Sequence, residues 1–505
     1  MELVRGLNEK GQFKTLPDGV KLYTLFNNKV PQADFDVTDL RKLGAAMRDL
    51  QASNVSAMAG YTYLGQFLAH DLSRLRIEGH NKTVKSFTTD ILRSDVSSVL
   101  DLSSVYDGAI AGSLMRKTGS AFMALGDAQV SDGPDLIGYD LPRNGLRACI
   151  GDDRNDENLI VSQLHVQFLK LHNFFVREIS HDSPELGTEL LFEAAREQVI
   201  LHYQEVILHD FLYEILHPAV WKAIILENKH ILWDPDPSEP AVLPVEYSAA
   251  AGRFGHAMVQ NNYNLNAVTS VSVSELFEMT GEGRFGGKYQ RMPATHLVDW
   301  RLFFDFPKHN TRGLPTRNKA LRISPRVRVD LINTQSLPVP EESNLATRNL
   351  LRGLQMRLSS GQATVNHLLN NYQARLLELE IPICLLNRDQ LNLNKPGFSQ
   401  HVLDSCSPAL STHTPLWYYV LAEACVETFE GIGKLGPLGS LIVAESIRGL
   451  LQLDRDSIMY KTRRQEITPS KNIANLPGRK FLQMSDLLLA ANNSISDPTS
   501  FITRQ

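Results

Sequence analysis

The sequence has few of the features that mark a specialised class of protein. Its four cysteines, Cys149, Cys384, Cys406 and Cys425, form no Cys-x-x-Cys pair, so neither a disulfide scaffold nor a zinc site is indicated. The net charge of -5 gives no electrostatic reason to expect nucleic acid or an anionic membrane as a partner. No run of 18 apolar residues offers a transmembrane segment. The first residues, MELVRGLNEKGQF, lack the apolar stretch of a signal peptide. We therefore expect a cytoplasmic protein, with leaderless export as the other route that such a sequence permits.

What the sequence does contain is helical periodicity. Apolar residues recur at three- and four-residue spacing in several segments, which predicts helices over 157–180, 190–216, 414–427 and 439–453. The segment 341–369 predicts two helices with a Ser-Ser-Gly break between them. Strand patterns are scarce, and the proline-rich stretches at 233–244 and 337–344 are too short to be domain linkers. We expect a mainly α fold with one large helical domain over residues 1–505.

Three polar clusters interrupt this apolar pattern. YLGQFLAHDLSR contains Gln66, His70 and Asp71, and AGRFGHAMVQ contains His256. CIGDDRNDENL contains Arg154 and Glu157, whose three-residue spacing at a helix start places them on one face. Each cluster by itself is explained as structural. In the cluster that contains Arg154 and Glu157, for example, Asp153 or Asn155 would serve as the cap of the following helix. Together the three clusters suit a single site.

Four other histidines carry a weaker signal. His165 and His172, and likewise His202 and His209, are seven residues apart on predicted helices. Each pair would lie about 10 Å apart along the helix axis, which is too far for one metal ion to bridge. The Glu-x-x-His pattern of di-iron bundles is absent. We interpret these four as structural, hydrogen-bonded histidines.

The clusters, written as Gln-x-x-x-His-Asp, Gly-Asp-x-Arg-x-x-Glu-Asn and Arg-x-Gly-His, resemble those of the peroxidase–cyclooxygenase superfamily. These are the animal-type haem peroxidases, and the similarity is greatest to their bacterial branch. It runs from about residue 55 to about residue 490 and includes the stretches RNDENLIVSQLHVQFLKLHN and LGPLGSLIVAESIRGLL. Three motifs in the same order make the resemblance specific.

The resemblance implies a haem b group, hydrogen peroxide as substrate and a small organic or halide electron donor, consistent with a response to oxidative stress. His256 would be the proximal ligand of the haem iron, and Arg253 would reach a haem propionate. His70 would be the distal acid-base group, and Arg154 would stabilise the charge that develops as the O–O bond breaks. Gln66 would bond a distal water or halide. An asparagine shortly before the tryptophan of a late helix supports the proximal histidine in the family, and counting back from Trp417 leads to Thr412 or His413.

A calcium site is also implied. In the family the aspartate that follows the distal histidine, here Asp71, is a calcium ligand. The stretch SSVLDLSSVY resembles the rest of the calcium loop, with Ser97, the Val99 carbonyl, Asp101 and Ser103 as matching donors. Such a set of oxygens suits calcium.

The sequence also departs from the family. Animal members attach haem through esters from an aspartate before the distal histidine and from the glutamate of Arg-x-x-Glu. Ala69 occupies the first position and cannot form an ester, and Asn158 after Glu157 excludes the methionine link of one member. We expect haem that is either non-covalent or linked once through Glu157.

Two other function classes are weighed against a peroxidase. A fatty-acid dioxygenase of the same superfamily needs a tyrosine three residues before the proximal histidine, where this chain has Arg253. A haem-binding or helical interaction protein without turnover would not need His70, Arg154 and His256 together. The sequence leaves the reducing substrate and the oligomeric state open.

Overall fold

The computed structural model describes residues 13–15, 21–26, 30–49, 55–72, 75–77, 92–94, 99–106, 116, 119–128, 138–238, 241–280, 292–307, 312–328, 344–393, 402–426, 433–462, 473 and 480–493. These residues are mainly helical, which confirms the predicted fold class. The α-helices are α1 (Val37–Ala46), α2 (Gly60–Leu72), α3 (Ser103–Tyr106), α5 (Leu159–Asp182), α6 (Thr188–Val206), α7 (Leu212–Ile215), α8 (Pro218–Val220), α9 (Val245–Ala249), α10 (Val273–Glu278), α12 (Leu345–Gln355), α13 (Gly361–Glu378), α14 (Arg388–Leu391), α15 (Val402–Cys406), α16 (Ala409–Thr412), α17 (Leu416–Glu423), α18 (Pro437–Leu453), α19 (Ile458–Lys461) and α21 (Met484–Asn493).

Shorter helical turns connect several of these helices. Four are 3-10 turns: η1 (Asp153–Asp156), η4 (Ala251–Ala257), η5 (Ala294–His296) and η6 (Trp300–Leu302). Two are π-helical: η2 (Ile207–Phe211) and η3 (Trp221–Leu226). The helix predicted over 190–216 corresponds to α6, which continues through η2 into α7.

The strands are short and form only two-stranded pairs among the described residues. These pairs are β1 (Phe13–Thr15) with β2 (Lys21–Tyr23), β3 (Arg48–Asp49) with β14 (Val327–Arg328), β4 (Val55–Met58) with β13 (Lys319–Leu321), β5 (Leu75–Ile77) with β6 (Leu92–Ser94), β7 (Gly126–Asp127) with β8 (Tyr139–Asp140), β9 (Arg143–Asn144) with β10 (Arg147–Ala148), and β11 (Asn262–Asn264) with β12 (Ser270–Ser272).

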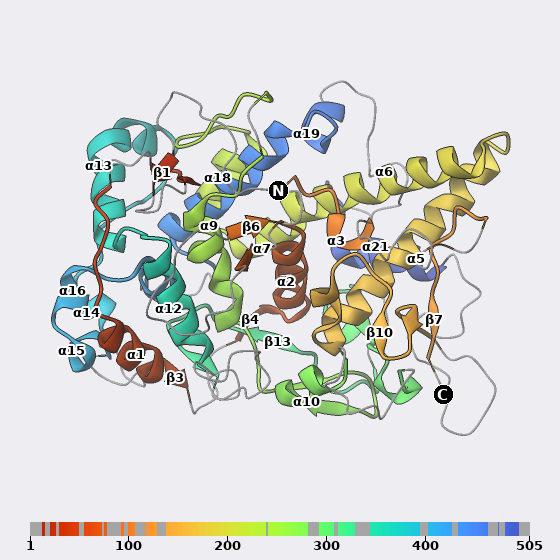
Figure 1. Cartoon of the computed structure of the whole chain (residues 1–505), viewed down its shortest axis with the longest axis horizontal. Coiled ribbons are helices and arrows are strands. Elements are labelled where there is room, and N and C mark those ends of the chain that lie inside the picture. Colours follow the sequence, from red (N-terminus) through yellow and green to blue (C-terminus); the bar gives the residue numbers. More distant parts are fainter. Residues whose placement is uncertain are drawn as a thin grey trace.

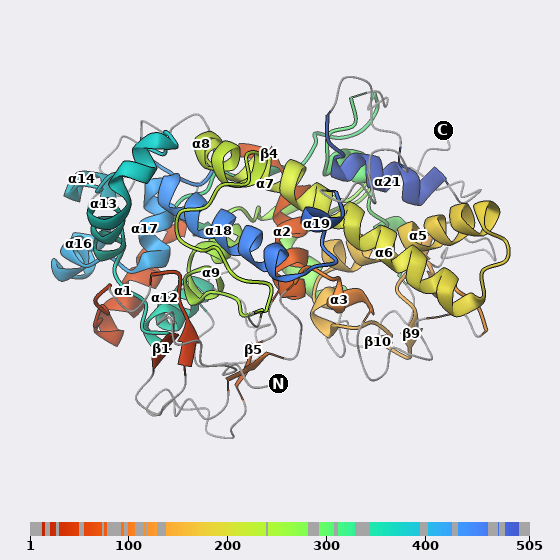
Figure 2. The same ribbon diagram turned by 90° about the horizontal axis from the view of Figure 1, so that it is seen from above.

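Helix α2 lies at the centre of the molecule in both views (Figures 1 and 2). On one side α5 and α6 run alongside each other toward one end, and on the other side α1, α12, α13 and α14–α16 form the opposite end. Helix α2 contacts α5, η1 and η4, so its residues can meet side chains from both halves of the fold.

The start of α2 is set by a close approach. The Gly60 N–H donates to the Phe303 carbonyl at 2.8 Å, and a Cβ at position 60 would lie 2.5 Å from that oxygen. Only glycine permits this approach, and it fixes where the helix that carries His70 begins.

Within the described residues no helix is both long and apolar enough to cross a membrane.

Helix α5 begins two residues later than predicted. Its N-cap is Asn158, whose side chain accepts from the Val161 N–H at 3.1 Å, so the expectation that Asp153 or Asn155 caps this helix was wrong. Arg154 lies in the preceding turn η1, which is capped by Asp152, and Glu157 ends that turn. The expected break between α12 and α13 is confirmed, with Ser360 as the N-cap of α13.

Candidate active site

His70 lies on the buried face of α2, where it is 7% exposed. Its Nδ1 is 2.9 Å from the Asn155 Oδ1. Because an amide oxygen can only accept, Nδ1 carries a proton and donates it. His70 Nε2 is 3.6 Å from a carboxylate oxygen of Glu157, a separation longer than a hydrogen bond. The imidazole is therefore held at Nδ1, and its Nε2 faces the Glu157 carboxylate.

Glu157 is held in place by a glutamine from α2. The Gln66 Nε2 donates to the Glu157 carboxylate, and the Gln66 Oε1 accepts from Asn158 at 3.1 Å. Burial opposes the charge of Glu157, but the neighbouring His70, Arg154 and Gln66 outweigh it and hold its pKa below the ordinary value. The predicted residues Gln66, His70 and Glu157 are thus brought together.

Arg154 is fixed by a bidentate ion pair. Its Nε and Nη2 donate to Asp152, with the shortest contact at 2.6 Å, and Nη2 also donates to the His70 carbonyl at 2.8 Å. Although burial disfavours the charge on Asp152, the guanidinium lowers the pKa of Asp152 to about 2. A fixed cation therefore lies against the helix turn that carries His70.

The turn η1 is held by ion pairs and a hydrogen bond to residues outside it. Arg143 forms ion pairs with Asp140 and Asp156, each at 2.8 Å, and all three side chains are largely buried. The Asp152 N–H donates to the Ser104 carbonyl at 3.0 Å. These bonds hold Arg154 and Asn155 in register with α2.

His256 lies in η4, and its partner differs from the expectation. The Asn349 Nδ2 on α12 is 2.8 Å from the His256 Nδ1. The prediction of Thr412 or His413 was wrong: both are exposed at the end of α16, where Thr412 donates to the Ala409 carbonyl at 3.0 Å. Counting along the chain failed because the partner comes from a helix 93 residues further on. A buried asparagine on an amphipathic helix was the available signal.

Arg253, in the same turn, donates to the Ser248 carbonyl at 2.7 Å and to the Asn349 Oδ1 at 3.0 Å. Both acceptors are uncharged. Burial, together with the charges of Arg352 and Arg348, lowers the pKa of Arg253 to about 9. Burial also lowers the pKa of Arg352 to about 10. Three arginines beside His256 form a cluster whose mutual repulsion an anionic group would relieve.

The two histidines belong to one site. Helix α2 contacts η4 directly. Burial and the charge of Arg253 lower the pKa of His256 to about 3, while the charge of Glu157, the neighbour of His70, raises it in part. His256 is therefore a neutral imidazole, the form that binds a metal. The carboxylate of Glu157 acts on both histidines, so the three predicted clusters do meet.

Asp71 faces away from this site and is fully buried. It accepts from the N–H groups of Leu102 and Ser104 at 3.3 and 3.4 Å. Burial and the charge of Asp101 raise its pKa well above the ordinary value. Val99, Asp101 and Ser103 lie in this loop, and Ser97 lies outside the described residues.

Two features of the loop suit a cation. The Ser103 Oγ is buried without a hydrogen-bond partner within the described part of the chain. Leu100 and Leu102 have φ of 54° and 55°, a left-handed backbone conformation that costs energy for a side chain of this size. No group of three or more His, Cys, Asp or Glu side chains in the described ranges is placed to bind a metal, so any cation here would need hydroxyl and carbonyl oxygens as well.

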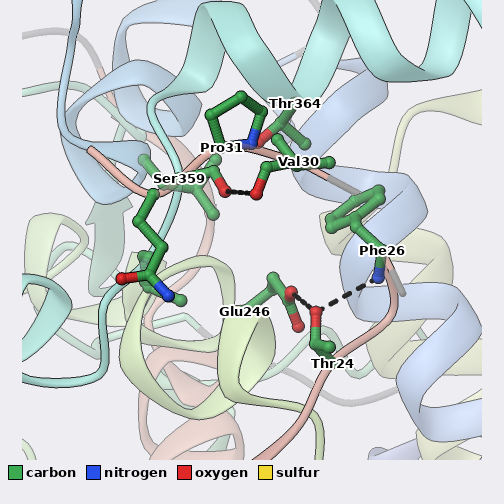
Figure 3. Close-up of a pocket in the computed structure, with 10 residues that line it drawn as sticks. Thr24, Phe26, Val30, Pro31, Glu246, Ser359 and Thr364 are labelled. Carbon is green, nitrogen blue, oxygen red and sulfur yellow. Dashed lines mark hydrogen bonds between the residues drawn. The ribbon is translucent and has the colours of Figure 1, made fainter. Parts of the chain in front are cut away.

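A cavity of about 360 Å³ lies elsewhere, between residues 24–26 and 30–32, α9 and the start of α13 (Figure 3). Glu246 points into it and accepts from the Thr24 hydroxyl, and Ser359 donates to the Val30 carbonyl at 3.3 Å. The side chains that line it include none of the predicted site residues.

Comparison with known proteins adds independent information. Residues 80–286 match the family model of the animal haem peroxidase, a range that includes Arg154, Glu157, Arg253 and His256. A peroxidase-like protein from Margaritifera margaritifera is 30% identical over 187 residues, which are 36% of this chain and 21% of that protein. The chain spans about a fifth of the length of the curated relatives it matches, or less.

Two solved structures share the fold. Peroxidase A from Dictyostelium discoideum has a TM-score of 0.64 at 16% identity, with 95% of each chain covered. A fatty acid alpha-dioxygenase from Oryza sativa has a TM-score of 0.57 at 13% identity, with 93% of this chain and 81% of that chain covered. At such identities the likeness concerns the fold.

Proposed function

We propose that this chain, a member of the animal haem peroxidase family, binds haem b and reduces hydrogen peroxide while oxidising a small organic or halide donor. One observation carries the proposal. His70 and His256 lie on elements that contact each other, and the charge of the Glu157 carboxylate acts on both imidazoles. A cytoplasmic location, a single domain over residues 1–505 and membership of the bacterial branch stay predictions.

The residues around His256 fit a haem group. His256 is neutral, and its Nε2 would bind the iron with the proton on Nδ1. As placed, the Asn349 amide presents Nδ2 to the His256 Nδ1 and Oδ1 to Arg253, so iron binding would require this amide to turn and accept from the Nδ1–H. Arg253, with Arg348 and Arg352 close by, would pair with the propionates, since a buried cationic cluster favours carboxylates. When bound, haem supplies the iron at which peroxide is reduced.

The distal residues would handle the protons and the charge. His70 Nε2 would take a proton from hydrogen peroxide and return it to the departing oxygen, because Nδ1 is already occupied by Asn155. Arg154, held by Asp152, would stabilise the negative charge that develops on that oxygen. Gln66, which contacts Glu157, would bond a distal water or halide.

Glu157 is the remaining candidate for a covalent haem bond. Ala69 cannot form an ester, so we propose haem that is free or attached once through Glu157. The carboxylate lies within the distal cluster and is ionised. A less constrained haem would be a weaker oxidant, and we expect phenols, iodide or bromide to be better donors than chloride.

A calcium ion would complete the second site. Asp71, the Val99 carbonyl, Asp101 and Ser103 would supply oxygen ligands, and the buried Ser103 hydroxyl supports this assignment. The ion would neutralise two neighbouring carboxylates whose repulsion burial intensifies.

A fatty-acid dioxygenase is the second candidate, favoured by the Oryza sativa structure. Arg253 argues against it, because it occupies the position where such an enzyme needs a tyrosine. Fatty acid added to the purified protein under oxygen distinguishes the two: a hydroperoxide product would support the dioxygenase.

The test of the peroxidase is spectroscopic and kinetic. The purified protein should show a Soret band, and His256→Ala should lose haem or turnover while its circular dichroism stays helical. His70→Ala should keep haem and react with peroxide at least about 100-fold more slowly. His202→Ala is the matched control, because His202 is also buried and its Nδ1 bonds to the Gln198 carbonyl of the same helix at 2.6 Å. Normal haem content together with a normal rate in His256→Ala would overturn the assignment.

A further inference from the structure

Among the described residues that line the cavity of Figure 3, Glu246 of α9 is the one with a charged side chain. It is buried, and its two carboxylate oxygens accept from different donors, the Thr24 hydroxyl and the Leu25 N–H, the latter at 3.1 Å. The Thr24 hydroxyl accepts from the Phe26 N–H at 3.2 Å and gives its own hydrogen to Glu246. Accepting at both oxygens is the pattern of an ionised carboxylate, so the cavity has a negative charge on one wall.

The other two hydroxyl groups that line the cavity also donate to protein atoms. Thr364, buried on α13, donates to the Ser360 carbonyl at 2.9 Å, and Ser359 donates to the Val30 carbonyl at 3.3 Å. The hydroxyl groups of the wall therefore offer a ligand oxygen atoms that accept. A ligand that satisfies such a wall is a hydrogen-bond donor, and a cationic donor gains most from the carboxylate.

The rest of the wall is apolar and limits the size of the ligand. Phe26, Leu358 and Leu416 are buried, whereas Pro31 and Gln32 are exposed and mark the entrance. The volume of about 360 Å³ is at the lower end of the range of small-molecule sites, roughly 300 to 1,000 Å³. This space suits one ring and a short chain. A bare metal ion would need a full shell of oxygen ligands, which an apolar wall does not provide.

We propose that this cavity is a binding site for a small aromatic amine. The protonated amine pairs with Glu246, and the ring lies against Phe26, Leu358 and Leu416. A carboxylate ligand such as a fatty acid is repelled by Glu246, because like charges interact strongly where water is excluded. The inference goes beyond the proposed function and does not rest on it, since the cavity includes none of the predicted haem or peroxide residues.

Glu246 also has a structural role, which the experiment must separate from binding. It bonds the segment 24–25 to α9, and the adjacent Tyr23 ring packs against Trp233 at 5.0 Å. The segment is thus held by an aromatic contact as well as by the carboxylate. Glu246→Gln keeps an accepting oxygen and the size of the side chain, so it should remove the charge and leave the cavity in place.

The experiment is isothermal titration calorimetry of the purified full chain at neutral pH with three probes of similar size. Phenethylamine is a cation, phenethyl alcohol is a neutral donor and hydrocinnamate is an anion. The amine should bind about 10- to 100-fold more tightly than the alcohol, the effect of one charge-assisted hydrogen bond, and hydrocinnamate should not bind. In Glu246→Gln the affinity for the amine should fall to that for the alcohol.

Two further variants locate the site. Ser359 lies at the cavity wall (Figure 3), so Ser359→Phe should fill the space and abolish the binding of amine and alcohol alike. Glu423→Gln is the matched control and should bind the amine like the native protein. Glu423 is also a buried carboxylate that accepts from backbone N–H groups, those of Leu438 at 3.0 Å and Gly439 at 3.2 Å, but it does not line the cavity. Circular dichroism checks that each variant is folded.

Equal affinity for the amine in the native protein and in folded Glu246→Gln would overturn the inference, and so would normal binding in Ser359→Phe. A Soret band that shifts when the amine is added would place the amine at the haem iron and would also overturn it. If Glu246→Gln does not fold, Ser359→Phe and the preference of the native protein for amine over hydrocinnamate decide. Amine binding by a protein that lacks haem or ignores peroxide would refute the proposed function alone.

Discussion

Removing calcium should lower the stability of the protein and slow its reaction with peroxide. The perturbation is EGTA, or the substitution Asp71→Asn. Asp71 is fully buried, and its burial together with the charge of Asp101 raises the pKa of Asp71 well above the ordinary value. Two ionised carboxylates in this loop are therefore unfavourable without a cation. The loop is also linked to the distal pocket, because the Ser104 carbonyl accepts from the Asp152 N–H and Asp152 holds Arg154.

The size of the effect follows from mass action. At 1 mM calcium and a dissociation constant of about 10 µM, binding contributes about 2.7 kcal/mol. A chain of 505 residues has an unfolding entropy of about 1 kcal/mol/K at ~2.1 cal/mol/K per residue, so Tm should fall by about 2 to 3 °C in EGTA. Differential scanning calorimetry measures this shift, and equilibrium dialysis measures the calcium bound per chain.

The control is a carboxylate of similar burial at a different place. Asp299 is 2% exposed and is paired with Arg301, so Asp299→Asn should lower Tm but keep the calcium-dependent shift. Asp71→Asn should lose the shift. Equal Tm values for the native protein in calcium and in EGTA would refute the reasoning, and so would a normal shift in Asp71→Asn.

Three further predictions concern the haem site and the core. Asn349→Leu should reduce the haem-to-protein ratio measured from the Soret and protein absorbances, because the His256 ring loses its support, whereas Thr412→Ala should leave the ratio unchanged; the reverse result would restore the expectation drawn from sequence counting. Glu157→Gln should make haem fully extractable into acid acetone after peroxide treatment, while the native protein should yield mass spectra of free or singly linked haem, and doubly linked haem would contradict the role of position 69. Burial raises the pKa of Glu205 from 4.5 to about 7, so the protein loses stability as the pH rises between these values. At about 1.4 kcal/mol per pH unit, Glu205→Gln should therefore be more stable than the native protein by about 3 kcal/mol in urea unfolding at pH 8. The two proteins should be equally stable near pH 4.5. Equal stability at pH 8 would show that the pKa of Glu205 is not raised in the folded protein.

Helices were predictable because their signal is local. The apolar spacing over 157–180 corresponds to α5, and the Ser-Ser-Gly break corresponds to the boundary between α12 and α13. Boundaries depend on single hydrogen bonds, so the sequence did not distinguish Asn158 from Asp153 or Asn155 as the cap.

The order of motifs along the chain was sufficient to nominate His70, Arg154 and His256, because each motif is a short run of residues. The sequence also determined on its own that Ala69 cannot form an ester. These statements concern which chemical groups are present, and they need no coordinates.

The partners of those groups were decided by the tertiary structure alone. Asn349 meets His256 across 93 residues, and His165 reaches His70 only through Asn155. Such contacts depend on how α12 packs against η4 and how α5 packs against α2, which spacing along the chain does not encode. In the sequence, His165 therefore had the pattern of a structural histidine. The packing of α5 against α2 places it on the other side of the Asn155 amide from His70.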